Sequence, residues 1–346
     1  MTRVLHRVLL LGAGRWGANH LRVLRHLPVE LFLADTNAAR LAPAREMGVP
    51  EDHLSTNPDA FLDRVDAAVV VTPAPSHFDL CSRLLKSGKD VFVEKPLTLR
   101  SKGSGELAQL AEAKGRILQV GHIFRFDPAS QWLRKEIAAG RFGRLKILRG
   151  NFSGFKRPRN DTGVTFADAI HFVDLFLFFL GTAPLQVTAM MKDFFGRGMD
   201  DESFIAMEFG TKVAPGTADR RVRTWATVET GYHSPGKARE VTVIGDELSA
   251  VCDFNVAQYK IKTFRNTHHA EGKEIKAVEG EMHQLEFPPE EPLLAELRAF
   301  IESVETRQTP LADGWAGYDA VRVIEAAIES AQSGRTVELA RSVRQE

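Results

Sequence analysis

The chain lacks a large set of cysteines, an excess of charge of either sign, and a long uninterrupted hydrophobic run. Cys81 and Cys252 are too few for a disulfide framework in 346 residues, which favours a reducing compartment, and we expect a cytoplasmic protein. The 45 Lys and Arg residues balance 45 Asp and Glu residues, without the basic excess of nucleic-acid-binding proteins, so we expect no nucleic-acid partner. The strongly apolar segment 172–180 is too short to cross a bilayer and contains Asp174, so we expect no membrane association.

What the chain does have is the composition of a globular protein, with 44% hydrophobic and 26% charged residues, and a length that favours two domains. Up to residue 120, apolar runs rich in Val, Leu and Ile alternate with helix-like segments. We predict strands at 7–11, 29–34, 67–71, 90–93 and 117–120, and helices at 18–27, 40–47, 78–86 and 107–114. This alternation predicts an α/β fold that begins with a doubly wound parallel sheet covered on both faces.

The pattern changes after residue 122, where we place the boundary between a domain of residues 1–122 and a domain of residues 123–346. Strands that follow helices predict an α+β second domain. The polar stretch 214–223 is expected to form a hairpin loop. The predicted helices of this domain lie at 129–139, 166–180, 293–305 and 316–330, and the predicted strands at 186–191, 203–209, 224–230, 240–244 and 258–264.

A glycine motif joins the first predicted strand to the first predicted helix. Gly12, Gly14 and Gly17, with Ala13, Arg15 and Trp16 between them, fit the pattern G-x-G-x-x-G in the strand–turn–helix context that a dinucleotide site requires. The first glycine permits the tight turn, the second lets the backbone approach a pyrophosphate, and the third lets helix and strand pack closely. The alternative is a plain glycine-rich turn.

Asp35 ends the second predicted strand, where a ribose-binding carboxylate is expected. Its carboxylate can accept from two ribose hydroxyls and would repel a 2′-phosphate, and the next residue is Thr36 rather than Arg. These features predict NAD rather than NADP as the cofactor. Arg40 can reach the adenine or a phosphate. Asp35 alone is also compatible with a turn cap.

Polar residues follow the third and fourth predicted strands. Ligands of open α/β sheets bind beyond the carboxyl ends of the strands, so these residues are predicted to meet the nicotinamide ribose. Lys95 precedes a proline, which restricts its backbone, and an enclosed lysine can act in proton transfer. A solvated lysine at a strand end is the alternative. The residues concerned are Thr72, Pro73, His77, Glu94 and Lys95.

Four segments together make the chain resemble the Gfo/Idh/MocA oxidoreductases. They are GAGRWG at 12–17, VVTPAPSH at 70–77, EKP at 94–96 and GHIFRFDP at 121–128. The resemblance implies an N-terminal Rossmann domain, then a domain with a large open mixed sheet, and a homo-oligomer, either a dimer or a tetramer. It also implies a catalytic Lys in EKP and an Asp four residues before a His.

Lys95 and His171 match that catalytic set, but the expected Asp position is Ala167. Asp168 is displaced by one residue, which is roughly 100° around an α-helix. Either a local distortion of the helix brings Asp168 into the catalytic Asp position, or the enzyme uses Lys95 and His171 alone. Asp168, His171 and Asp174 follow one another at i,i+3 spacing in an otherwise apolar helix. Burying ionisable groups is costly unless they are paired, so their presence here favours a functional site. The alternative is a structural His–Asp pair whose hydrogen bonds are satisfied inside the core. The histidines are scattered, so no metal site is predicted.

A basic loop, Lys156 to Arg159, precedes this helix, and Arg125 lies where the first domain passes into the second. We expect these cations to need an anionic partner, and Arg157 and Arg159 can bind a diphosphate. The predicted substrate ligands are Arg125, Arg157, Arg159 and Asp174. Three segments resemble the family branch that oxidises UDP-N-acetylglucosamine at C3. They are VGHIFRFDPA at 120–129, LKILRGNFSGFKRPRND at 145–161 and IHFVDLFLFFLG at 170–181. The predicted reaction is therefore hydride transfer between C3 of a nucleotide sugar and NAD. A free sugar or polyol (inositol or glucose) dehydrogenase and a non-catalytic NAD-binding sensor are the alternatives, and a solvated loop is the alternative for the cations.

Overall fold

The computed structural model describes residues 6–210 and 223–340, so most of the predicted hairpin loop at 214–223 lies outside the described residues. The chain divides into two compact units. The first contains the residues up to 126 together with residues 290–321, and the second contains residues 127–289 and those from 322 on. The predicted boundary after residue 122 therefore lies close to the first crossing, but the return of residues 290–321 to the first unit did not follow from the sequence.

The first unit is built on a parallel sheet of six strands in the order β3-β2-β1-β4-β5-β6. Alternate residues of β1 enter two different cores. Val8 and Leu10 join one cluster and Leu9 and Leu11 the other, so the sheet is buried on both faces, as predicted. The strands are β1 (His6–Leu11), β2 (Val29–Ala34), β3 (Leu54–Ser55), β4 (Ala67–Val70), β5 (Asp90–Glu94) and β6 (Leu118–Gly121).

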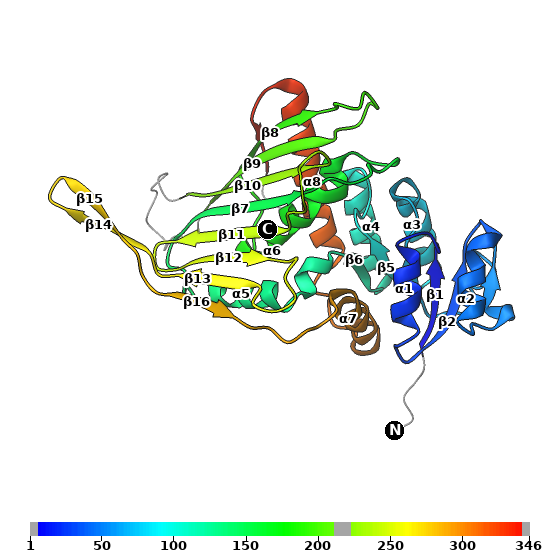
Figure 1. The fold of residues 1–346 in the computed structure, drawn as a ribbon. Helices are drawn as coiled ribbons and strands as arrows, with labels where there is room; N and C mark the ends of the chain where they lie inside the picture. The colour runs from blue at the N-terminus through cyan, green and yellow to red at the C-terminus, as the bar shows by residue number, and fades with distance from the viewer. Residues whose placement is uncertain (1–5, 211–222, 341–346) are drawn as a thin grey trace. The chain divides into compact units, whose positions relative to one another are not determined.

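Helices α1 (Gly17–Leu24), α2 (Ala42–Glu46), α3 (His77–Lys86) and α4 (Ser101–Lys114) follow the strands in alternation (Figure 1). A later helix, α7 (Pro292–Thr306), packs against α1. Its Leu297 and Phe300 are fully buried in the same cluster as Leu21 and Leu24 of α1. This packing explains why residues 290–321 belong to the first unit.

The second unit contains a mixed sheet of nine strands in the order β16-β13-β12-β11-β7-β10-β9-β8-β17. β7 and β10 are parallel, and the other neighbouring strands are antiparallel. The large open mixed sheet is thereby confirmed. Its strands are β7 (Leu145–Ser153), β8 (Gln186–Lys192), β9 (Glu202–Gly210), β10 (Arg223–Gly231), β11 (Glu240–Gly245), β12 (Ser249–Asp253), β13 (Ile261–Phe264), β16 (Met282–Leu285) and β17 (Val337–Glu338).

Helices α5 (Pro128–Ala138) and α6 (Ile170–Leu180) belong to this unit, and α6 contacts β7 and β10 (Figure 1). Gly150 of β7 permits that contact, because a Cβ there would lie 2.8 Å from the ring of Phe172. Helix α8 (Gly314–Ser333) passes through residue 321, where the two units divide. No helix within the described ranges is long and apolar enough to cross a membrane.

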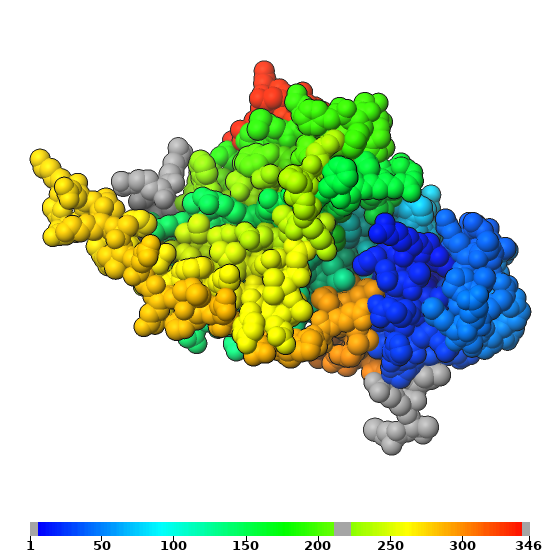
Figure 2. All heavy atoms as spheres, viewed as in Figure 1, coloured from blue at the N-terminus to red at the C-terminus, as the bar shows by residue number. Residues whose placement is uncertain are grey.

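A two-stranded hairpin, β14 (Thr267–Glu271) and β15 (Glu274–Val278), connects β13 to β16. Figure 2 shows it, in yellow and orange, standing clear of the nine-stranded sheet. All five β15 residues and four of the five in β14 are exposed. The hairpin therefore contributes little to the core of its unit.

Candidate functional site

The glycine motif forms the tight turn between β1 and α1. Gly12 has a φ of +95°, and a Cβ on it would lie 2.6 Å from the Val71 carbonyl oxygen. A Cβ on Gly17 would lie 2.0 Å from the Gly12 carbonyl oxygen, so both positions require glycine. The nearest atom to a Cβ on Gly14 is Nη1 of Arg40 at 3.8 Å, which leaves the middle of the turn open. This open turn at the start of a helix fits a pyrophosphate.

Asp35 lies directly after β2, and its side chain is almost fully buried. Its Oδ2 accepts from the Ala13 N–H and its Oδ1 from the Asn37 N–H, both at 2.8 Å. Arg40 contacts the same carboxylate at 3.5 Å, whereas Thr36, Arg15 and Arg40 itself are exposed. A carboxylate fixed beside the glycine turn fits the ribose of NAD.

Glu94 connects the glycine turn to the end of β5. Its Oε1 accepts from the Trp16 indole N–H at 2.5 Å and lies 2.8 Å from Nε2 of His20, while its Oε2 accepts from the Lys95 N–H at 3.2 Å. Burial opposes ionisation of Glu94, but the contacts with His20 and Trp16 outweigh it and lower the pKa of the carboxyl. Glu94 was predicted as a cofactor ligand, and in the structure its carboxylate links these protein groups.

His20 did not emerge from the sequence as a site residue. The available signal is a histidine on the buried face of the amphipathic helix that follows the glycine motif, where a polar group requires a partner. Glu94 is that partner.

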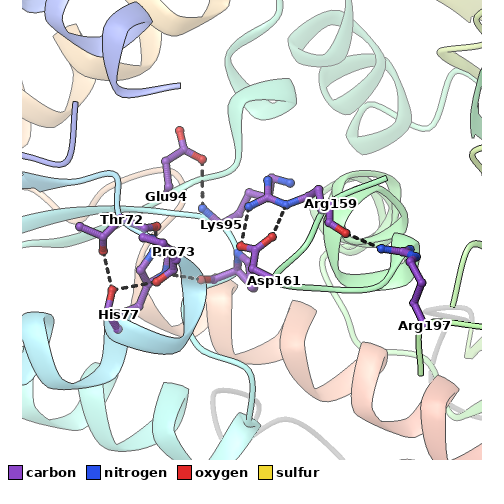
Figure 3. Close-up of polar contacts among 10 residues, drawn as sticks. Thr72, Pro73, His77, Glu94, Lys95, Arg159, Asp161 and Arg197 are labelled. Atoms are coloured by element: carbon purple, nitrogen blue, oxygen red, sulfur yellow. Dashed lines mark hydrogen bonds and ion pairs between the residues drawn. The ribbon is translucent and has the colours of Figure 1, made fainter. Parts of the chain in front are cut away.

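His77 bridges two strand ends. Its Nδ1 lies 2.8 Å from the Pro96 carbonyl oxygen and its Nε2 lies 2.9 Å from the Thr72 carbonyl oxygen (Figure 3). Burial lowers the pKa of the imidazole. Because both ring nitrogens face backbone carbonyls, His77 holds the Thr72–Pro73 turn and the segment after Lys95 in place. The Lys95 side chain is half-buried at that edge of the sheet.

The second unit holds a separate set of ionisable residues around the start of α6. Residues Thr165–Ala169 form a π-helical turn before α6, where the sequence predicted continuous α-helix. Asp168 lies in this turn, and its Oδ2 is 2.5 Å from Nζ of Lys156. The His171 ring stacks on the Phe152 ring of β7, with centroids 5.1 Å apart. π-helical turns often occur at functional sites.

Asp200 fixes the beginning of this turn and was missed by the sequence reasoning. Its Oδ2 accepts from the Thr165 N–H at 2.7 Å and the Thr165 hydroxyl at 2.6 Å. A Cβ on Gly163 would lie 1.9 Å from Oδ1 of Asp200. The glycine therefore makes room for the carboxylate. The partners lie far apart in sequence, so no local pattern indicated the contact.

Two of the three cations of the basic loop have carboxylate partners within the protein. Lys156 pairs with Asp168, and Arg159 donates two hydrogen bonds of 2.8 Å to Asp161, which raises the pKa of the guanidinium. Figure 3 shows the Arg159–Asp161 pair and the Arg159 carbonyl, which accepts from Arg197. Arg157 is exposed.

Two further predicted substrate ligands are buried. Arg125 has only 6% of its surface exposed and donates to the Leu311 carbonyl oxygen at 2.8 Å. Asp174 is buried among the apolar residues of α6. Within residues 6–210 and 223–340, no group of three His, Cys, Asp or Glu side chains is arranged to hold a metal ion.

Two family models match the chain. One, described as an oxidoreductase family with an NAD-binding Rossmann fold, matches residues 6–122, and the other, the C-terminal alpha/beta domain of that oxidoreductase family, matches residues 134–339. The chain is 26% identical over 324 residues to the UDP-N-acetylglucosamine 3-dehydrogenase of Acidithiobacillus ferrooxidans, covering 92% of this chain and 94% of that protein. It is 27% identical over 348 residues to the scyllo-inositol 2-dehydrogenase (NAD(+)) of Bacillus subtilis, with 96% of both covered.

Solved structures agree at the level of the fold. The A. ferrooxidans enzyme superposes with a TM-score of 0.77 at 23% identity, covering 96% of this chain and 99% of that one. An aldose-aldose oxidoreductase from Caulobacter crescentus superposes with a TM-score of 0.79 at 20% identity, covering 97% and 100%. Because the two family models together match most of its length, the chain belongs to the Gfo/Idh/MocA family and is an NAD-binding oxidoreductase.

Proposed function

We propose that this protein is an NAD-dependent dehydrogenase that oxidises a sugar hydroxyl, with C3 of a nucleotide sugar as the reacting carbon. One observation supports this most. The first unit combines an open glycine turn, the fixed Asp35 carboxylate and Lys95 at the same sheet edge, whereas the second places His171 and Asp168 at the start of an otherwise apolar helix. Carbinol oxidation requires a dinucleotide site and groups that can take a proton.

The chain's own residues have defined parts in this proposal. The glycine turn and Asp35 hold the cofactor, which supplies the acceptor for the hydrogen and electron pair leaving the carbinol carbon. Lys95 and His171 share the proton that leaves the hydroxyl oxygen. Glu94 and His77 fix the backbone on either side of Lys95 through the contacts described above. Asp168 holds a negative charge at the start of α6.

Two observations bear on the substrate. Relatives of similar identity are named for a nucleotide sugar and for an inositol. The carboxylate partners of Lys156 and Arg159 favour the second candidate, a free sugar or polyol, because these cations do not need a phosphate. The exposed Arg157 supports the nucleotide sugar, because its guanidinium can take a phosphate oxygen pair.

Arg157→Ala tests the nucleotide-sugar proposal. A diphosphate is remote from the reacting carbon, so we expect this variant to raise KM for a UDP-hexose more than it lowers kcat. Arg265→Ala, which removes another exposed arginine, is the matched control and should change neither. Equal kinetics of Arg157→Ala and Arg265→Ala would assign Arg157 to the solvated surface. NAD binding without turnover of any sugar would instead indicate a sensor.

A further inference from the structure

Lys156 lies where two parallel strands end together. Phe152 of β7 is opposite Thr230 of β10, and the chain continues from β10 into Tyr232. The Lys156 N–H donates to the Tyr232 carbonyl oxygen at 3.4 Å. The Lys156 ammonium lies 5.3 Å from the centroid of the Phe152 ring and 5.4 Å from that of the Tyr232 ring. Both distances are in the range of cation–π attraction, so the strand ends hold the ammonium in a defined place.

The same aromatic ring links Lys156 to His171. Phe152 stacks on the His171 imidazole at an interplanar angle of 21°. Asp168, three residues before His171, faces the Lys156 ammonium at 2.5 Å, and its side chain is only 10% exposed. A half-buried lysine, a buried carboxylate and the imidazole therefore form one local arrangement around Phe152.

Other charged and titratable groups surround this arrangement. The Arg239 guanidinium lies 3.6 Å from the Phe152 centroid, and Arg159 is paired with Asp161. Burial lowers the pKa of Lys156, and Arg239 and Arg159 add to that effect, whereas Asp168 opposes it. Burial and the charges of Asp168 and Asp200 raise the pKa of Tyr232, so its phenol stays neutral.

We propose that Lys156 is a positioning residue for the reaction, whose ammonium holds Asp168 in place and offsets its charge beside His171, so that the imidazole remains available as a base. The inference rests on the proposed function of His171. An uncompensated carboxylate would favour the protonated imidazole. Lys156 counters that effect, which assigns it to the proton-transfer machinery and not to phosphate binding.

An NMR titration of the His171 imidazole, with its signal assigned by His171→Asn, tests this without any substrate. Lys156→Met should raise the His171 midpoint by at least about half a pH unit, because Asp168 loses its counter-charge. Lys156→Arg should keep the midpoint, and the double variant Lys156→Met with Asp168→Asn should reverse the rise. An unchanged midpoint in folded Lys156→Met, or a rise that persists in the double variant, would overturn the proposal.

Two further variants keep the test decisive. Lys146→Met removes an ammonium of β7 that pairs with Asp246 at 2.7 Å, and it should leave the His171 midpoint unchanged. If Lys156→Met fails to fold, Asp168→Asn leaves an uncompensated ammonium and should lower the midpoint, and a raised or unchanged value would contradict the proposal. If no sugar is oxidised, the proposed function fails, and the titration still decides the role of Lys156.

The pH profile of kcat gives a second measurement once a substrate is known. The acidic limb should move to higher pH in Lys156→Met, because His171 then holds its proton more strongly. The affinity for NAD should not change, because the glycine turn and Asp35 belong to the first unit. A general loss of kcat with an unmoved acidic limb would identify Lys156 as merely structural.

Discussion

Asp35 and Arg40 have opposite effects on the choice of cofactor. The Asp35 carboxylate is fixed by two backbone N–H groups and faces the Arg40 guanidinium at 3.5 Å. A carboxylate accepts from ribose hydroxyls and repels a 2′-phosphate, whereas a guanidinium attracts that phosphate. The buried carboxylate dominates, because Arg40 is exposed and screened by solvent.

We therefore expect NAD(H) to bind more tightly than NADP(H), and we expect Asp35→Ala to reduce this difference in affinity. Part of this reduction should come from Arg40, which loses its carboxylate partner and becomes available to attract the 2′-phosphate of NADP(H). The double variant Asp35→Ala with Arg40→Ala should accordingly bind NADP(H) more weakly than Asp35→Ala does. Fluorescence titration of the four proteins with both cofactors measures this. Equal or stronger NADP(H) binding by the unmodified protein would contradict the assignment.

Lys95 and His171 carry the proposed proton transfer. We expect Lys95→Ala and His171→Ala each to lower kcat by roughly 10²–10⁴-fold, the usual size of a general acid–base contribution. Asp168→Asn should have a smaller effect, since Asp168 is displaced from the position that the family resemblance implies. NAD affinity should change little in His171→Ala. Steady-state kinetics check these effects, and a near-normal rate in His171→Ala would refute its role.

At the scale of elements, the π-helical turn Thr165–Ala169 sets the direction of Asp168. A π-helix turns through a smaller angle per residue than an α-helix, so the displacement of Asp168 from position 167 is smaller than in a regular α-helix. Asp200 holds the first residue of the turn, and Gly163 makes room for its carboxylate. The Asp168–Lys156 pair thus depends on a contact made from another part of the chain.

Asp200→Ala should remove both hydrogen bonds to Thr165 and lower the free energy of unfolding by about 1–2 kcal/mol. Gly163→Ala should also destabilise the protein, because its Cβ would overlap the Asp200 carboxylate. Denaturant unfolding measures both losses. The double variant should lose less free energy of unfolding than the sum of the two single losses, since Asp200→Ala removes the carboxylate oxygen that a Cβ at position 163 would overlap. Strict additivity would contradict this account of the glycine.

Sequence patterns predicted elements where burial dictates composition. Continuous apolar runs indicated β1, β2, β4, β5 and β6, because strands covered on both faces must be apolar. β14 and β15 are exposed, so burial imposed no continuous apolar run on them and they gave no such signal. The Lys156–Asp168 pair joins a loop to a turn, and neither local pattern indicates that contact. The glycine turn and Asp35 could be predicted because their spacing reflects one local strand–turn–helix unit.

At the scale of the whole molecule, the first unit is assembled from two separate stretches of chain. Helix α7 buries Leu293, Leu297 and Phe300 in the cluster that contains Leu21 and Leu24. Without it, that apolar surface of the first stretch would face water, at a cost of about 25 cal/mol for each Å² exposed. We therefore expect the stretch that the first family model matches, residues 6–122, not to fold independently of α7.

We expect a fragment that ends at residue 126 to unfold without cooperativity and to bind NAD poorly. A fragment that joins residues 1–126 to residues 290–321 through a flexible linker should unfold cooperatively and bind NAD. Circular dichroism during thermal unfolding and titration with NAD compare the two. Equal stability of both fragments would show that α7 is dispensable for the first unit.

The most direct test of the proposed function is NADH formation by the full chain with NAD and a panel of UDP-hexoses, free hexoses and inositols. We predict turnover of a UDP-hexose with a kcat/KM above that of every free sugar or inositol, and loss of that turnover in His171→Ala. Far more efficient oxidation of myo-inositol or glucose would contradict the nucleotide-sugar substrate while leaving the dehydrogenase intact. NAD binding without oxidation of any member of the panel would contradict the dehydrogenase itself.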